Sequence, residues 1–295
     1  MRIAITGSTG RVGAALVRHL ASQHDIIPLP RAECDFEDSA SLQSALDSLE
    51  CDVFINPAAL TNLETCEDNP RLAMRVNSAA PGKIAIWAAE RGVRMIHLST
   101  DYLVDGETTI PLTETMRPAP VSAYGRSKLA GEQAVLTHPG NLVLRVAWVF
   151  GPEKPAFVDQ IFDDALAGKP LSAVADKFSL PTCTTDLAQW ISALLETDAS
   201  GVLHACNPGK AVSWHGMAEF VVREMTACGL LQSCPDVAEL KLDEITFFHA
   251  RRPRFTMMDN TRLSRLIGDL RPWPEALAEY VKYRCDSTTE IPPGP

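Results

Sequence analysis

The chain has 295 residues, 46% of them hydrophobic and 22% charged, so it carries enough apolar material for a globular core. Its formal net charge of −10 argues against a protein that binds nucleic acid or an anionic membrane surface. No apolar run reaches the ~18 residues that span a bilayer. The cysteines are scattered without a CxxC pair, which is typical of a protein of the reducing cytoplasm.

A strand, a glycine turn and a helix follow one another at the N-terminus. Residues 2–6 (RIAIT) are an apolar run typical of a buried parallel strand, and helical periodicity begins at Ala14. In the turn GSTGRVG, Gly7 favours a tight turn and Gly10 lets the backbone approach a pyrophosphate. Gly13 allows close helix–strand packing. We therefore predict a nicotinamide dinucleotide bound by Gly7, Thr9, Gly10, Arg11, Val12 and Gly13.

The residues after the second predicted strand, 25–29, bear on the choice between NAD and NADP. Arg31 would accept a ribose 2′-phosphate, whereas an acid such as Asp35 would hold a 2′-hydroxyl. Arg11 in the glycine turn could reach the same phosphate. Both charges are present, so the sequence leaves NAD(H) and NADP(H) open with a slight lean to NADP(H). The alternative is that both arginines are ordinary solvated side chains.

Strands and helices alternate through the first half of the chain, which predicts a doubly wound parallel sheet, a Rossmann-like α/β fold. The remaining strands are expected at 52–55, 94–98, 142–149 and 202–206, and the helices at 39–49, 70–89 with a kink or break at Pro81, 186–195, 214–228 and 274–283.

Prolines interrupt the pattern after Gly151, which predicts a smaller α+β substrate-binding lobe. Residues 1–150 would form the dinucleotide-binding domain, with 181–206 returning to it. Residues 151–285 would form mainly the lobe. Residues 286–295 would be a polar, proline-rich, disordered tail.

Tyr124 and Lys128 are four residues apart in a segment with helical character, so they share one helix face. A cation near a phenol favours the phenolate, so we expect Lys128 to lower the pKa of Tyr124 and prepare it for proton transfer. Thr100 follows the strand at 94–98, at the carboxyl edge where α/β sheets bind ligands. His97 within that strand is interpreted as a core histidine. No set of side chains has metal-ligand spacing.

On these residues the chain resembles the extended short-chain dehydrogenase/reductases, and within them the dTDP-4-dehydrorhamnose reductases. The resemblance covers the chain to about Arg284 and rests on nine motifs in order: GSTGRVG, CDFED, NPAALTN, RVNSAAPGKIA, HLSTDYLVDG, YGRSK, LRVAWVFG, LPTCTTDLA and RRPRFTMMD.

The resemblance implies that Thr100, Tyr124 and Lys128 form a catalytic triad that reduces a 4-keto sugar, with Tyr124 as the general acid. It implies cofactor contacts for the triad members Tyr124 and Lys128 and for Arg31, Asp35, Phe36, Ala58, Ala59, Leu60 and Asn77. It implies contacts with the nucleotide-sugar for Thr61, Asp101, Tyr102, Trp148 and Arg252.

Two other activities stay open within the resemblance. Sugar dehydratases of the superfamily carry an Asp-Glu pair after the Thr, whereas here Asp101 and Tyr102 follow Thr100, which favours reduction over elimination. A nucleotide-sugar 4-epimerase needs only the triad and a retained cofactor. Another carbonyl reductase of the superfamily, acting on a different carbonyl, also stays open. A non-catalytic NADP-binding subunit, like the regulatory subunit of methionine adenosyltransferase, has no need of an intact triad. The family also implies a homodimer.

Overall fold

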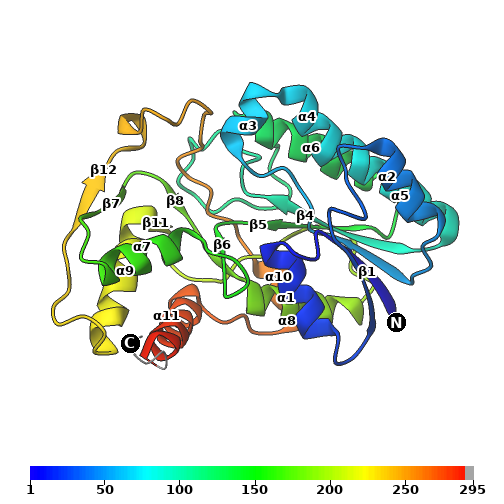
Figure 1. Cartoon of the computed structure of the whole chain (residues 1–295). Helices are drawn as coiled ribbons and strands as arrows, with labels where there is room; N and C mark the ends of the chain where they lie inside the picture. The colour runs from blue at the N-terminus through cyan, green and yellow to red at the C-terminus, as the bar shows by residue number, and fades with distance from the viewer. Residues whose placement is uncertain (290–295) are drawn as a thin grey trace.

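A six-stranded parallel sheet forms the centre of the computed structural model, which describes residues 1–289 (Figure 1). The strand order is β10-β5-β4-β3-β1-β2. The strands span Arg2–Thr6 (β1), Asp25–Leu29 (β2), Val53–Asn56 (β3), Arg94–Thr100 (β4), Leu142–Val146 (β5) and Gly201–His204 (β10). The order reverses beside β1, as in a doubly wound sheet, so the predicted fold class is confirmed.

Side chains that alternate along each strand build one core on either face of the sheet. In β1, Ile3 and Ile5 pack on one face and Ala4 on the other. The first face is covered by α1 (Arg11–Leu20), α8 (Thr184–Leu195) and α10 (Thr261–Ile267). The second is covered by α2 (Ser39–Asp47), α5 (Ala80–Arg91) and α6 (Ala123–Val135).

The predicted helix at 70–89 is present but is interrupted in a different place. It follows the short α3 (Leu63–Asp68) and consists of α4 (Pro70–Met74), a π-helical turn η1 (Arg75–Ala79) and α5. Pro81 lies in the first turn of α5, directly after this π-helical turn. The prediction of a break at Pro81 is therefore wrong in position. The proline is tolerated because the preceding turn already departs from regular α-helical hydrogen bonding.

A second group of elements packs beside the sheet around its own apolar core. Its helices are α7 (Phe157–Leu166), α9 (Trp214–Ala227), α11 (Trp273–Thr289) and the 3₁₀ turn η2 (Leu242–Glu244). Its strand pairs are β7 (Leu171–Val174) with β12 (Val237–Leu240), β8 (Phe178–Ser179) with β11 (Val212–Ser213), and β6 (Val149–Phe150) with β9 (Thr182–Cys183).

Several boundaries differ from those predicted, among them the following three. The strand expected at 142–149 is split, because Trp148 has a φ of +43°, which an extended strand does not allow. The strand expected at 202–206 begins at Gly201 and ends at His204, where it pairs with β5. The expected tail is wrong for residues 286–289, which extend helix α11. Residues 290–295 lie outside the described part of the chain.

No helix within residues 1–289 combines the length and the apolar character that a membrane crossing requires.

A buried ion pair holds α6 on the sheet. Arg145 of β5 donates its Nε to Glu132 Oε1 at 2.9 Å and its Nη2 to Glu132 Oε2 at 2.8 Å. The two side chains are 9% and 2% exposed. Because both charges are removed from water, each depends on the other for compensation.

Replacing Glu132 with Ala should therefore destabilise the protein by about 3–5 kcal/mol, since it leaves the Arg145 charge buried and unpaired. Urea unfolding followed by circular dichroism measures this loss. Lys169→Ala, which breaks the solvent-exposed pair with Asp164, is the matched control and should leave the unfolding midpoint nearly unchanged. Equal effects of the two substitutions would contradict the assigned role of the buried pair.

Candidate active site

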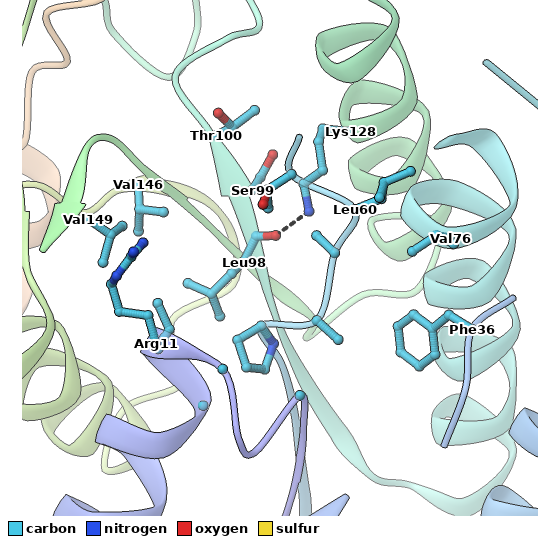
Figure 2. A pocket seen from close by; sticks show the side chains of 18 of the residues that line it. Arg11, Phe36, Leu60, Val76, Leu98, Ser99, Thr100, Lys128, Val146 and Val149 are labelled. Atoms are coloured by element: carbon cyan, nitrogen blue, oxygen red, sulfur yellow. Dashed lines mark hydrogen bonds between the residues drawn. The ribbon is translucent and has the colours of Figure 1, made fainter. Parts of the chain in front are cut away.

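A cavity of about 660 Å³ opens at the carboxyl edge of the sheet. The glycine turn after β1, the loops after β2 and β3, the end of β4, the start of α6 and the segment after β5 all line it (Figure 2). This is the edge where open α/β sheets bind their ligands. Sequence segments more than a hundred residues apart therefore meet around one space.

The glycine turn has the backbone geometry that the sequence predicts. Gly7 has a φ of +52°, a backbone conformation that favours glycine. The turn lies against Ala58, since a Cβ on Gly7 would be 3.2 Å from the Ala58 Cβ. A Cβ on Gly13 would lie 2.1 Å from the Gly7 carbonyl oxygen, so α1 packs directly on the turn. Its first backbone N–H groups have no acceptor within the helix and border the cavity. This surface fits a diphosphate group.

Arg11 and Arg31 both line the cavity, in different surroundings. Arg11 donates its Nε to the Lys154 carbonyl oxygen at 3.2 Å and its guanidinium also contacts the Pro155 carbonyl. It therefore joins the glycine turn to the segment after β6. The Arg31 side chain is 70% exposed, with Asp35 at 3.5 Å and Glu37 at 2.5 Å. Arg31 is the arginine that a ligand can reach without breaking backbone contacts.

Asn77 does not line the cavity, but it holds a segment that does. Its side chain accepts from the Leu60 N–H at 2.8 Å and donates to the Leu60 carbonyl at 2.9 Å. It also donates to Ser127 of α6 at 3.0 Å. Asn77 thus fixes the Ala58–Leu60 segment relative to the helix that carries Tyr124. Asn77 therefore supports the cavity wall without lining the cavity.

Thr100, Tyr124 and Lys128 all line the cavity. Lys128 is buried and donates its Nζ to the Leu98 carbonyl oxygen at 2.6 Å, the dashed contact in Figure 2. Burial lowers the pKa of Lys128 to about 8, and the nearby Glu132 opposes this shift. Lys128 therefore loses its proton more readily than an ordinary lysine side chain.

The expected effect of Lys128 on the pKa of Tyr124 is wrong for this structure. Burial raises the pKa of the Tyr124 phenol above its ordinary value, and the hydrogen bond with Thr100 is the main opposing influence. The physical reason is that desolvation of the phenolate outweighs the attraction of its neighbours. At neutral pH the phenol holds its proton, as a general acid must.

Asp101 borders the cavity, but both of its carboxylate oxygens are engaged. Oδ1 accepts from Thr100 Oγ1 at 3.2 Å, and Oδ2 accepts from Ser179 Oγ at 3.2 Å. Burial raises the pKa of Asp101, and the positive charge of Lys177 opposes that rise. The structure therefore places Asp101 behind Thr100 as a support.

Lys177 is a functional candidate that the sequence gave no reason to select. It is fully buried and donates its Nζ to the Pro253 carbonyl oxygen at 2.6 Å. The same Nζ lies 4.7 Å from the centre of the Tyr102 ring and 5.7 Å from that of Trp148. Both rings line the cavity, so Lys177 braces its aromatic wall by cation–π contacts.

Arg252 lies apart from the other predicted substrate contacts. It borders a second cavity of about 530 Å³ that is also lined by Phe248 and Arg254. Its guanidinium pairs with Glu64 at 2.5 Å and lies 3.5 Å from the centre of the Phe248 ring. The other predicted residues, apart from Asn77, line the larger cavity.

Several residues of the larger cavity were missed at the sequence level. Leu98, Ser99 and Pro57 adjoin predicted positions, so their signal was the strand end itself. Four others also adjoin predicted positions: Cys34, Glu37, Val76 and Val149. The remaining three do not: Leu63, Val146 and Lys154. Among residues 1–289, the buried Ser99 Oγ and Trp148 Nε1 have no hydrogen-bond partner. Unsatisfied polar atoms in a cavity wall point to a ligand.

A sequence profile described as RmlD substrate binding domain matches residues 1–285. The chain belongs to this family. The dTDP-4-dehydrorhamnose reductase of Burkholderia thailandensis is 32% identical and aligns with 96% of this chain and 98% of its own length. The resemblance to extended short-chain dehydrogenase/reductases of the dTDP-4-dehydrorhamnose reductase type is thereby confirmed.

Solved structures of dTDP-4-dehydrorhamnose reductases agree with the fold. The dTDP-4-dehydrorhamnose reductase of Clostridium acetobutylicum superposes with a TM-score of 0.88 at 28% identity, covering 96% of this chain and 99% of that one. The Bacillus anthracis enzyme in complex with NADP superposes with a TM-score of 0.86 at 27% identity, covering 95% and 98%.

Gly13→Ala should lower both the melting temperature and the affinity for NADPH, because the new Cβ would meet the Gly7 carbonyl oxygen at 2.1 Å. Thermal unfolding and NADPH fluorescence titration measure the two effects. Gly10→Ala is the matched control, since its Cβ would lie 3.0 Å from the same oxygen, and it should be milder in melting temperature. A Gly13→Ala protein with wild-type values for both would refute the close packing of α1.

Proposed function

We propose that this protein is an NAD(P)H-dependent reductase of a nucleotide-linked 4-keto-6-deoxy sugar. The observation that carries the proposal is the convergence of Thr100, Tyr124 and Lys128 on one cavity with the glycine turn. The cofactor fits this turn because the first backbone N–H groups of α1 border the cavity and have no acceptor within the helix. When bound, the nicotinamide supplies the hydride that reaches C4 of the sugar.

Tyr124 completes the reduction as the general acid. Its phenolic proton passes to the C4 oxygen, so the carbonyl becomes a secondary alcohol and a phenolate remains on the protein. The hydrogen-bonding contact with Thr100 orients the phenol. Lys128 lies one helical turn away, where its amine holds the ribose and returns a proton to Tyr124.

The surroundings of Asp101 favour reduction over elimination. A dehydratase needs a carboxylate free to remove the C5 proton. Here the Asp101 oxygens accept from Thr100 and Ser179, and the next residue is Tyr102. Asp101 thus supports Thr100 and is not positioned as a base.

The nucleotide and the sugar are proposed by analogy with the relatives. The Burkholderia thailandensis relative and a Streptomyces niveus relative, a dTDP-4-keto-6-deoxy-D-glucose reductase with 31% identity, are both named for dTDP-sugars. We therefore propose a dTDP-linked substrate whose sugar contacts Thr61, Tyr102 and Trp148 in the larger cavity. Arg252 would contact the nucleotide part of this substrate from the second cavity.

We also propose a domain division, a cellular location and an oligomeric state. Residues 151–285 would supply mainly the substrate-binding lobe. A cytoplasmic location is proposed from the cysteine pattern of the sequence. A homodimer is proposed from the superfamily, and light scattering of the purified protein tests it.

Tyr124→Phe should lower kcat for reduction of dTDP-4-keto-6-deoxyhexose by about 10²–10⁴-fold while the affinity for NADPH is kept, because the ring remains and only the acidic proton is lost. Absorbance of the nicotinamide and fluorescence titration measure the two quantities. Tyr283→Phe, at an exposed position of α11, is the matched control.

Failure of wild-type protein to oxidise NADPH with any of a panel of nucleotide-linked keto sugars would refute the reductase proposal. Interconversion of sugar epimers without net loss of NADPH would instead identify an epimerase.

Arg31→Ala should weaken NADPH binding about tenfold and leave NADH binding almost unchanged, because only NADPH carries the 2′-phosphate that an arginine at this strand end recognises. Fluorescence titration with both cofactors measures the ratio. Arg71→Ala, an exposed arginine of α4 outside the cavity, should change neither affinity. An equal loss for both cofactors would show that Arg31 does not read the phosphate.

A further inference from the structure

Lys128 has a second polar neighbour besides the Leu98 carbonyl. His97 Nε2 lies 3.4 Å from Lys128 Nζ, and both side chains are buried. His97 and Leu98 are consecutive in β4, so the strand presents a carbonyl oxygen and an imidazole to the same amine. The core position expected for His97 is confirmed, but the side chain also contacts a triad residue.

The protonation of His97 is set by Asn56 of the neighbouring strand β3. Asn56 Oδ1 lies 3.2 Å from the backbone nitrogen of Ala58 and 2.6 Å from Thr6 Oγ1. A backbone N–H can only donate, so the atom facing it must be the amide oxygen. The Asn56 amide nitrogen therefore faces His97 Nδ1, at 3.1 Å, and donates to it.

This chain of contacts leaves one tautomer for the neutral imidazole. Because Nδ1 accepts, the ring proton lies on Nε2. Burial and the charge of Lys128 both lower the pKa of His97 well below its ordinary value, so the ring is neutral. The Nε2–H then points toward Lys128 Nζ. A neutral amine can accept it, whereas an ammonium presents a second N–H.

We propose that Asn56 and His97 are positioning residues that hold the Nε2–H tautomer against Lys128 and thereby make the Lys128 ammonium a stronger acid. The proposal rests on the reductase function and names residues of the same site. After Tyr124 gives its proton to the substrate, Lys128 must release one to restore the phenol. A lysine that gives up its proton readily performs this step faster.

Burial makes the Lys128 ammonium more acidic, and the charged groups around it do not add to this effect. Glu132, on the same face of α6, raises the pKa of Lys128, and its carboxylate is paired with Arg145 of β5. Tyr124 keeps its proton and is uncharged. Among these neighbours, His97 of β4 is the one whose proton faces the amine.

Asn56→Asp tests the proposal because it is isosteric and reverses the tautomer. One aspartate oxygen can still accept hydrogen bonds from Thr6 and Ala58, while the other oxygen accepts a hydrogen bond from the Nδ1–H of His97. His97 Nε2 would then accept from the Lys128 ammonium. The titration midpoint of Lys128, followed by the ¹³Cε chemical shift, should rise by about one unit from its wild-type value, which is about 8.

The basic limb of kcat/KM should move to higher pH by the same amount, since reduction needs the proton that Lys128 then holds more strongly. Thr6→Val is the matched control: it removes one donor to Asn56 but leaves the Ala58 N–H to orient the amide. It should leave both the tautomer and the midpoint unchanged.

The ¹⁵N spectrum of histidine-labelled protein with NADP⁺ reports the tautomer of His97 in the absence of turnover. The His97 signal is identified as the signal that is missing from the spectrum of His97→Gln. A wild-type Nε2–H signal supports the proposal. A wild-type Nδ1–H or imidazolium signal overturns it, even if Asn56→Asp does not fold. An inverted tautomer with an unmoved Lys128 midpoint also overturns it. Absence of turnover with the expected tautomer would refute the reductase function instead.

Discussion

The burial of the Lys128 amine against the carbonyl of Leu98 ties the helix that carries Tyr124 to the strand that ends at Thr100. A lysine leaves water only if its hydrogens find acceptors, so this contact selects one register of α6 on β4. The ion pair between Glu132 and Arg145 holds the same helix on β5. The phenol and the hydroxyl of the triad meet because both elements are fixed in this way.

A second buried lysine performs a comparable task. Lys177 contacts the Pro253 carbonyl and the rings of Tyr102 and Trp148, which come from three separate segments. Its charge also favours the ionised form of Asp101, which accepts from Thr100. The wall proposed to contact the sugar is thus connected to the residues proposed to perform the chemistry.

Much of the first half of the fold followed from local signals. The run RIAIT and the glycines after it predict a strand, turn and helix because periodicity and glycine conformation act over a few residues. Local signals failed to predict element boundaries that depend on contacts with distant parts of the chain. Trp148 ends β5 early with a φ of +43°, and α11 continues to Thr289 through residues expected to be a tail.

What the sequence determined by itself was the fold class, the family and the positions of Thr100, Tyr124 and Lys128, since these depend on patterns carried within short motifs. Only the tertiary structure decided which side chains meet. His97 and Lys128, Asp101 and Ser179, and Arg11 and Pro155 are far apart in the chain. Their contacts depend on strand register, helix packing and desolvation, which exist only once the chain has folded.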